Sequence, residues 1–441
     1  MNSVRTYPLV FAACCLVTGL IPATVDAAEP GMTNAQFAEK ARRLQKLVEE
    51  RMVQAHGMIP MFVRAGDYKL PTAEDYTGAY KHRHLRGKTE AEIGIPPMHV
   101  WRAWENTSTN TAFYLRAMAY QYLVTGNPEV LAICRRTFAA LKYIYTLPIE
   151  KGEKGFLCKP YGGQYSNQGG RDQLQCVTWG LVAYRPIAPP QDLADLDTIT
   201  RDFADFALKI PNVSPHGYFG RDAEEYGKEW RSDSWDRAIS FLPLLYLAWQ
   251  GTGDDKYATE IQRWYDDCAK DRSFVFPTDK FSTSGFGGKR NFYLPTFLMD
   301  VKPSHRELWR QTMLSHYHQS RTGLLPDGTW PAFWTYDSET GKMTSKENQQ
   351  YSFSHARTGR SALFAQACVA AQRWFPEVNM AGDARHILEN LDEHTFRFVM
   401  PLDDKHPLPA EWVVESKMLD GDSLTGWLCA YWEGRYRGYW K

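Results

Sequence analysis

The sequence lacks several features that mark common classes of protein. Its 441 residues carry no formal net charge, because 51 basic side chains balance 51 acidic ones. No segment gathers the lysines and arginines of a nucleic-acid-binding face. The one long apolar run, Leu9–Ile21, is too short to span a bilayer. Alternating apolar and polar residues are scarce, which argues against a large β-domain. We therefore expect neither nucleic acid nor a membrane span.

Cysteines are few and scattered. Two lie in the N-terminal apolar run, and the other six lack the C-x-x-C spacing of a metal knuckle. Arg5, the apolar run and the small residues before Ala27 match a cleavable secretion signal over residues 1–27. We therefore predict export to the periplasm or the medium, where one or two disulfides are possible. We expect most of the thiols to be buried and free, and we predict no metal and no cofactor.

Aromatic residues are abundant, at 14% of the chain with 15 Trp, 24 Tyr and 22 Phe. Flat aromatic faces fill large cores and also stack on amphipathic ligands such as sugar rings. Several of them lie in polar, glycine-containing segments, where core packing alone does not account for their number. We predict that four line the mouth of a sugar-binding pocket: Trp101, Tyr165, Trp230 and Trp334.

Residues 228–257 form a unit that recurs in the chain. A polar start that suits a helix cap leads into an almost wholly apolar run over residues 238–249. A T-G-D-D turn then leads into an amphipathic helix. A helix that is apolar on all sides must be buried on all sides, whereas its successor needs only one buried stripe. Residues 115–141 repeat this order with a T-G-N-P turn, so we predict hairpins of one inner and one outer helix.

The hairpin recurs six times at intervals of about sixty residues, which predicts an all-α fold, the (α/α)6 toroid. The predicted inner helices start near Thr109, Arg171, Ser234, Phe292, Ala356 and Leu424. The predicted outer helices cover residues 34–54, 128–145, 191–210, 254–270, 304–320 and 381–398. We expect a single catalytic domain over residues 28–441, since closed toroids often exceed the usual domain size.

The connections between these helices alternate in length. Inner-to-outer connections are short and outer-to-inner connections are long, so the long loops should gather on the face where the inner helices begin. That face also collects the positive ends of the helix dipoles. A polar binding pocket is therefore predicted at the inner-helix N-termini.

The residues at these helix starts mix carboxylates with arginines and amides. Helix capping explains the serines, but an arginine at a helix N-terminus opposes the dipole and needs another reason. Glycosidic cleavage needs a carboxylic acid to protonate the leaving group, and often a second carboxylate to activate water. Paired arginines suit a substrate carboxylate. The predicted carboxylates are Asp172 and Glu105, with Asp233 as a substitute for either, and the predicted arginines are Arg171, Arg231, Arg357 and Arg360.

Two stretches, Gly169-Gly170-Arg171-Asp172-Gln173 and Trp230-Arg231-Ser232-Asp233-Ser234-Trp235, carry a family resemblance. With the paired helices, they resemble the six-hairpin glycosidases, and within them the unsaturated uronyl hydrolases of glycoside hydrolase families 88 and 105. The resemblance implies that Asp172 is the catalytic acid and that Trp230, Arg231 and Trp235 lie at the pocket. Glu105 matches an early aspartate of those families by position only. This chain departs from them where serines replace two glycines and Asp233 replaces an amide, and a neighbouring uronic-acid-specific family fits these residues equally well.

Three functions fit this sequence. The first is a secreted glycoside hydrolase acting on oligosaccharides that contain uronic acid. The second is a polysaccharide lyase on the same toroid, in which a tyrosine or histidine such as Tyr161, Tyr165 or His355 removes the proton beside the uronate carboxylate. The third is a non-catalytic glycan-binding protein, in which the aromatic residues matter and no carboxylate does. If the protein is a glycoside hydrolase, we predict that His355 is a further substrate-binding residue.

Overall fold

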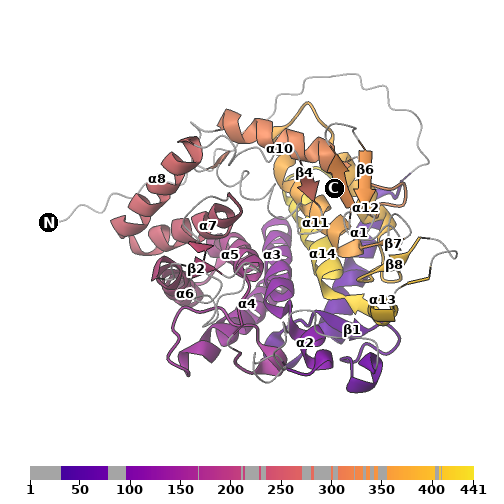
Figure 1. The fold of residues 1–441 in the computed structure, drawn as a ribbon, viewed down its shortest axis with the longest axis horizontal. Coiled ribbons are helices and arrows are strands. Elements are labelled where there is room, and N and C mark those ends of the chain that lie inside the picture. The colour runs from indigo at the N-terminus through magenta and orange to yellow at the C-terminus, as the bar shows by residue number, and fades with distance from the viewer. Residues whose placement is uncertain are drawn as a thin grey trace.

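The computed structural model describes residues 31–77, 96–166, 168–209, 212–213, 228–229, 235–270, 280–282, 299–300, 306–321, 323–330, 334–337, 342–345, 355–402, 407–408 and 410–441. Within these ranges the main helices form an inner and an outer ring (Figure 1). The inner helices are α3 (Thr107–Thr125), α5 (Arg171–Tyr184), α7 (Trp235–Thr252), α11 (Thr358–Ala371) and α14 (Gly421–Tyr436). The outer helices are α1 (Asn34–Leu47), α4 (Pro128–Ile149), α6 (Pro190–Lys209), α8 (Asp255–Lys270), α10 (Arg306–Arg321) and α12 (Met380–Asn390).

This alternation confirms the predicted (α/α)6 toroid, and the inner helices that the structure describes start within a few residues of their predicted positions. The start predicted near Phe292 lies outside the described residues. Two outer helices end well before their predicted ends. α1 ends at Leu47, with a π-helical stretch that continues to Met52, and α12 ends at Asn390 and does not continue to residue 398. There Asp392 Oδ1 accepts hydrogen bonds from the amides of His394 at 2.9 Å and Thr395 at 3.1 Å, which stabilises a turn.

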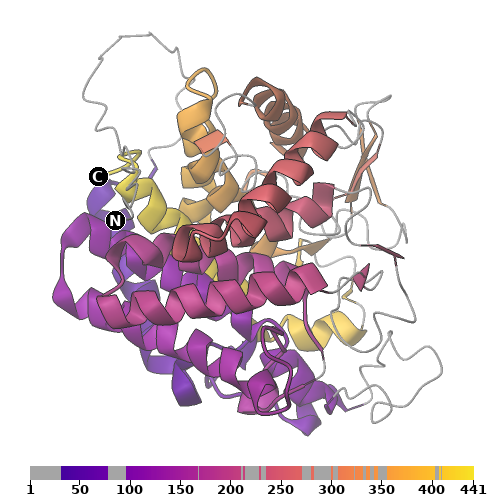
Figure 2. The same ribbon diagram turned by 90° about the vertical axis from the view of Figure 1, so that its left-hand side faces the viewer.

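Burial separates the two rings as the sequence pattern predicted. Every residue of α14 from Gly421 to Gly434 is buried, so this helix has no solvent face. In α1, by contrast, burial follows a stripe through Phe37, Ala41 and Leu44. The view turned by 90° shows helices lying side by side along the molecule (Figure 2).

Neighbouring outer helices share a recurrent contact in which a tyrosine hydroxyl donates to an aspartate. These pairs are Tyr145 (α4) to Asp202 (α6), Tyr257 (α8) to Asp205 (α6) at 2.7 Å, and Tyr317 (α10) to Asp383 (α12) at 2.6 Å. Burial, followed by the bonded carboxylate, raises the pKa of Tyr257 to about 12. These phenols therefore stay protonated and act as donors that fix the spacing of the outer ring.

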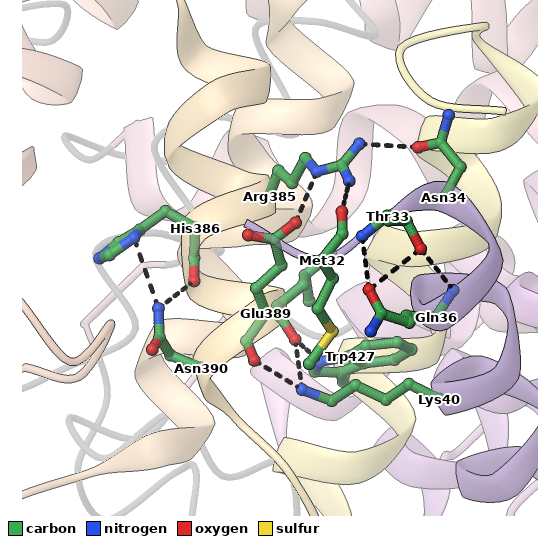
Figure 3. A network of polar contacts seen from close by, with 11 residues as sticks. Met32, Thr33, Asn34, Gln36, Lys40, Arg385, His386, Glu389, Asn390 and Trp427 are labelled. Carbon is green, nitrogen blue, oxygen red and sulfur yellow. Dashed lines mark hydrogen bonds and ion pairs between the residues drawn. The ribbon is translucent and has the colours of Figure 1, made fainter. Parts of the chain in front are cut away.

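The ring closes where its first helix meets its last ones (Figure 3). Lys40 Nζ of α1 donates to the carbonyls of Leu388 and Glu389, both at 2.9 Å, at the C-terminal end of α12. A cation is favoured there by the helix dipole. Trp427 Nε1 of α14 donates to the same Leu388 carbonyl at 2.8 Å. Burial lowers the pKa of Lys40 to about 8, so this closure is a tightly enclosed polar contact.

Strands are short, and their pairings were not predicted. They are β1 (Phe62–Arg64) with β9 (Met418–Asp420), β2 (Asn212–Val213) with β3 (Lys228–Glu229), β7 (His355–Ala356) with β8 (Met400–Pro401), and the three-stranded order β4 (Lys280–Ser282), β5 (Trp334–Asp337), β6 (Lys342–Ser345). All of these pairs are antiparallel. The segment between α1 and α3 supplies β1, which pairs with β9 at the start of α14, and also α2 (Met98–Trp104).

In the described part of the chain, no helix is both long enough and apolar enough to cross a membrane. Residues 1–27, predicted as the secretion signal, lie outside that part. Cys134, Cys158, Cys176, Cys368 and Cys429 are buried free thiols, as expected for most of the cysteines.

Candidate active site

Four inner helices begin at one end of the ring, which we call the start face. Gln173 Nε2 in α5 donates to Asn106 Oδ1 at 3.3 Å, directly before α3. Asn106 Nδ2 donates in turn to Asp422 Oδ2 of α14 at 3.2 Å. Thr358 Oγ1 of α11 lies 2.9 Å from Ser423 Oγ of α14. These contacts join the helix starts on one face, as the alternation of short and long connections predicted.

Below the start face, side chains fill the axis of the ring. Trp179 of α5 packs against Ala370 of α11. These two helices are separated around the ring by α3 and α14, so their contact crosses the axis. Nearer the start face, Phe113, Cys176 and Leu363 form a second buried cluster from α3, α5 and α11. This cluster, which we call the floor, closes the ring beneath the helix starts.

Helical spacing identifies the side chains directly above the floor. Residues three or four apart share a helix face. Asp172 precedes the floor residue Cys176 by one turn, and Arg360 precedes the floor residue Leu363 by one turn. A carboxylate from α5 and a guanidinium from α11 are therefore placed on the axial faces of their helices, at the level of the helix starts.

Asp422 belongs to the same level. It precedes Cys429 of α14 by two helical turns, and the Cys429 thiol lies close enough to Cys176 for the two to interact electrostatically. Since Cys176 is a floor residue, this face of α14 points to the axis. The Asp422 side chain is buried and accepts the hydrogen bond from Asn106.

Asp172 lies in the first turn of α5 and is partly buried. Its carboxylate folds back over the preceding glycine, because a Cβ added to Gly170 would lie 2.8 Å from Asp172 Oδ1. The backbone of Gly170 is extended, with φ −128° and ψ 126°, so a tight turn is not the reason for glycine here. Gly170 instead leaves room for the carboxylate.

Glu105 is held by two cations at the start face. Lys159 Nζ donates to its Oε1 at 2.9 Å, and Arg102 Nη1 donates to its Oε2 at 3.3 Å. Both cations are buried, and Arg102 also pairs with buried Glu415 of α13 (Ala410–Glu415). This row of alternating charges fixes the loop after α4 to α2 and α13. Both oxygens of Glu105 already accept hydrogen bonds, and its role as a catalytic base stays a prediction.

Asp420 is the N-cap of α14. Its Oδ1 accepts from the amide of Asp422 at 3.1 Å, and its Oδ2 accepts from Ser423 Oγ at 2.6 Å. Burial and then the neighbouring Asp422 carboxylate raise the pKa of Asp420 to about 7. Near neutral pH this residue therefore competes with Asp422 for negative charge.

Asp420→Asn is expected to remove a pH dependence of stability. An unfolded aspartate ionises at about pH 4, whereas the folded Asp420 keeps its proton up to about pH 7. Between these values the folded chain binds more protons than the unfolded chain, so the free energy of unfolding falls as pH rises. Asparagine does not titrate, so the free energy of unfolding of the variant should rise relative to that of the wild type as the pH increases across this window. Urea denaturation at several pH values measures the difference, and parallel curves would contradict the assignment.

Arg357 and Arg360 lie next to each other at the start of α11. Arg357 is the N-cap residue, and its Cζ lies 4.4 Å from the ring centre of Phe398 and 5.9 Å from that of Trp412. Burial and then the charge of Arg357 lower the pKa of Arg360. Two like charges held together at a helix N-terminus create a positive potential that an anionic group stabilises.

The remaining predicted site residues differ in burial, and several of them lie outside the described residues. Trp101 is 5% exposed and belongs to the main core, so this structure does not favour it as a stacking platform. His355 is fully buried and meets Trp412 edge-on at 5.4 Å. Tyr165 is partly buried and donates to Glu153 at 2.7 Å. The side chains of Arg171, Trp235 and Trp334, and the whole of Trp230, Arg231 and Asp233, lie outside the described residues.

Sequence reasoning predicted no catalytic or substrate-binding role for Asn106, Gln173, Lys159 or Asp422. Asp422 had a usable signal, since it lies two helical turns before a cysteine in a helix that is mostly apolar over residues 424–432. Lys159 had none, because its contact with Glu105 joins a loop to a helix far away in the chain.

Comparisons with known proteins agree with this fold. No family model matches the chain, and no curated protein is similar to it in sequence. The structure of a sugar epimerase from a ruminal bacterium matches with a TM-score of 0.54 and 12% identity, covering 92% of this chain and 99% of that one. An unsaturated glucuronyl hydrolase specific for heparin gives 0.52 and 14%, covering 92% and 97%. A D-mannose isomerase gives 0.52 and 10%, covering 91% and 97%. The predicted six-hairpin toroid fold is therefore confirmed.

Proposed function

We propose that this chain is an exported glycoside hydrolase that cleaves oligosaccharides containing a uronic acid. The observation that carries the proposal is that a carboxylate, Asp172, and a partly buried arginine, Arg360, each lie one helical turn before a residue of the floor. Acid-assisted cleavage needs the first, and recognition of a sugar carboxylate needs the second. The shared fold of an unsaturated glucuronyl hydrolase supports this choice of substrate.

Each group has a defined task in this proposal. The Arg357–Arg360 pair binds the uronate carboxylate and so fixes the sugar above the apolar floor. Asp172 gives its proton to the glycosidic oxygen while the bond from that oxygen to the sugar carbon breaks. A water molecule supplies the oxygen that bonds to this carbon, and its proton leaves to a carboxylate. The products are two sugars with one water added between them.

Arg360→Gln is expected to weaken binding of acidic substrates selectively. The variant removes the charge that binds the substrate carboxylate in this proposal, so KM for a uronide should rise by about tenfold or more, since a hydrogen bond to a charged group contributes about 1.5–3 kcal/mol. The methyl ester of the same uronide is the matched control, because it lacks the charge. Steady-state kinetics on both substrates measure this. An equal rise in KM for the ester would contradict carboxylate recognition.

Product analysis on a panel of acidic oligosaccharides tests the proposed function. A hydrolase releases one new reducing end per cleavage, adds the mass of water and creates no carbon–carbon double bond. A new ultraviolet-absorbing double bond would establish the lyase instead. A rearranged sugar of unchanged mass would establish an epimerase or isomerase, and binding without any product would establish a glycan-binding protein. Each of these three results overturns the hydrolase.

A further inference from the structure

We propose that Gln173 and Thr109 form a subsite for one hydroxyl group of the substrate, the 2-hydroxyl on the ring carbon next to the anomeric carbon. This inference rests on the proposed function, because it names a substrate group that the same site recognises. The hydroxyl donates a hydrogen bond to Gln173 Oε1 and accepts one from Thr109 Oγ1. The two side chains take no part in the covalent step and act as specificity-determining residues.

The orientation of the Gln173 amide is the first argument. Gln173 Nε2 donates to the backbone carbonyl of Glu105 and, at 3.3 Å, to Asn106 Oδ1. A carbonyl oxygen only accepts, so the NH2 group of the amide faces Glu105 and Oε1 points the other way. Gln173 is 1% exposed, and its Oε1 accepts no hydrogen bond from the described part of the chain. A buried acceptor without a donor costs free energy, which a ligand hydroxyl would recover.

Thr109 is the second argument, because its hydroxyl lacks the partner that other buried helical threonines use. Thr178 and Thr425 each donate to the carbonyl four residues earlier, at 2.8 and 2.7 Å. For Thr109 that carbonyl belongs to Glu105, and it accepts from Gln173 Nε2 instead. Thr109 is 1% exposed, and within the described residues its Oγ1 makes no hydrogen bond. A buried hydroxyl is thus left over beside a buried acceptor.

The third argument is that both side chains lie at the level of the proposed site. Thr109 of α3 precedes the floor residue Phe113 by one helical turn, and Gln173 of α5 precedes the floor residue Cys176 by one turn. The two helices pack against each other, so these side chains lie above adjoining parts of the floor. A group held between them would therefore lie on the floor, where the proposed function places the sugar.

The fourth argument is the position of Gln173 beside the predicted acid. A Cβ added to Gly170 would lie 2.8 Å from Asp172 Oδ1 and 3.3 Å from Gln173 Cδ, so the carboxylate and the amide are neighbours. Asp172 is partly exposed whereas Gln173 is buried, which places the amide on the inner side of the acid. The 2-hydroxyl is adjacent in the sugar to the oxygen that Asp172 would protonate. Hydrogen bonds to this hydroxyl strengthen in the transition state of glycoside cleavage.

The test compares Gln173→Met, Thr109→Val and Thr109→Ser with the wild type in the full chain, on a uronide and on its 2-deoxy analogue. The measured quantity is the ratio of kcat/KM for the uronide to that for the analogue, in which any general loss of activity cancels. We expect Gln173→Met and Thr109→Val each to lower this ratio by about fivefold or more, the contribution of one neutral hydrogen bond. Thr109→Ser should keep the ratio, because serine retains the hydroxyl.

Gln121→Met is the matched control for the loss of a buried glutamine. Gln121 lies two helical turns beyond Phe113 in α3, and its Oε1 also has no hydrogen-bond partner among the described residues. This variant should leave the ratio unchanged, because Gln121 lies on the far side of the floor from the proposed site.

The outcomes separate this inference from the proposed function. If the wild type cleaves the uronide but the ratio stays constant in Gln173→Met and Thr109→Val, these side chains only support the fold, and the hydrolase stands without the subsite. A ratio that changes only with a 3-deoxy analogue would also overturn the assignment. A wild type that cleaves no uronide removes both proposals. Thr109→Val, which keeps the shape of threonine, carries the test if circular dichroism shows that Gln173→Met does not fold.

Discussion

Asp172→Asn is expected to lower kcat by at least about 10²-fold on an oligosaccharide uronide, because a positioned general acid contributes about that much or more. Asparagine keeps the size of the side chain and removes the proton. KM should change little, since the proposed binding site for the uronate carboxylate is formed by Arg357 and Arg360. Because Asp172 lies at the surface end of α5 and is only partly buried, the thermal unfolding temperature should stay close to that of the wild type.

Gly170→Ala gives a second and independent test of the same acid. The added Cβ would lie 2.8 Å from Asp172 Oδ1, so the carboxylate has to move while the residue itself is unchanged. A displacement of about 1 Å in a reacting group costs about 10²-fold. Gly66→Ala is the matched control, because nothing lies within 4 Å of a Cβ added there. If Asp172→Asn and Gly170→Ala both turn over normally, the acid lies on another inner helix, and Asp233→Asn becomes the variant to examine.

The sequence predicts the fold well because the toroid is built from local patterns. A helix such as α14, in which every residue from Gly421 to Gly434 is buried, is recognised by a mostly apolar run, and a helix such as α1 is recognised by an apolar stripe. Two of the turns between helices share a Thr-Gly pair, which Asn127 follows in one and Asp254 in the other. The pairing of β1 with β9 cannot be predicted from local patterns, because it joins Phe62 to Asp420, which lie far apart in the sequence. The end of α12 cannot be predicted from them for another reason, since the side-chain turn at Asp392 overrides an apolar periodicity that continues to residue 398.

The site is predicted less completely than the fold. Asp172 and Arg360 follow from one rule, that residues at inner-helix starts face the axis, and the floor residues one turn further on agree with it. The same rule applies to Asp422, but an acidic residue in the first helical turn is also what capping predicts, so the sequence alone does not distinguish the two roles. The environment of Glu105 depends on Lys159 and Glu415, whose proximity arises only in the folded chain. The sequence thus shows which residue stands at a helix start, but it does not show which charged groups surround that residue in the folded chain.

On the side of the floor opposite the start face, the inner helices carry a buried ion network. Arg116 of α3 lies one turn after the floor residue Phe113 and pairs with Glu433 of α14. Arg437 donates to the same Glu433 carboxylate at 2.8 and 2.6 Å. Burial opposes ionisation of Glu433, but the charges of Arg116 and then Arg437 outweigh it, and the pKa of Glu433 is lowered. Its ionised form therefore stabilises the fold above its ordinary pKa of 4.5, and this stability is lost as the pH falls through the lowered value.

Glu433→Gln is accordingly expected to lower the free energy of unfolding by about 3–5 kcal/mol, the usual loss when one partner of a buried ion pair is removed. The amide keeps the volume of the side chain, but it leaves the buried Arg116 guanidinium, which also lies 5.7 Å from the ring centre of Trp179, without its carboxylate. Urea denaturation near neutral pH measures the loss. Glu39→Gln is the control, because its pair with Arg42 is exposed and such pairs contribute about 0–1 kcal/mol. Adding Arg116→Met to Glu433→Gln should recover part of the loss, since it removes a buried charge that the first change left uncompensated. A single variant as stable as the control would show that solvent, and not the carboxylate, neutralises the arginines at this end of the ring.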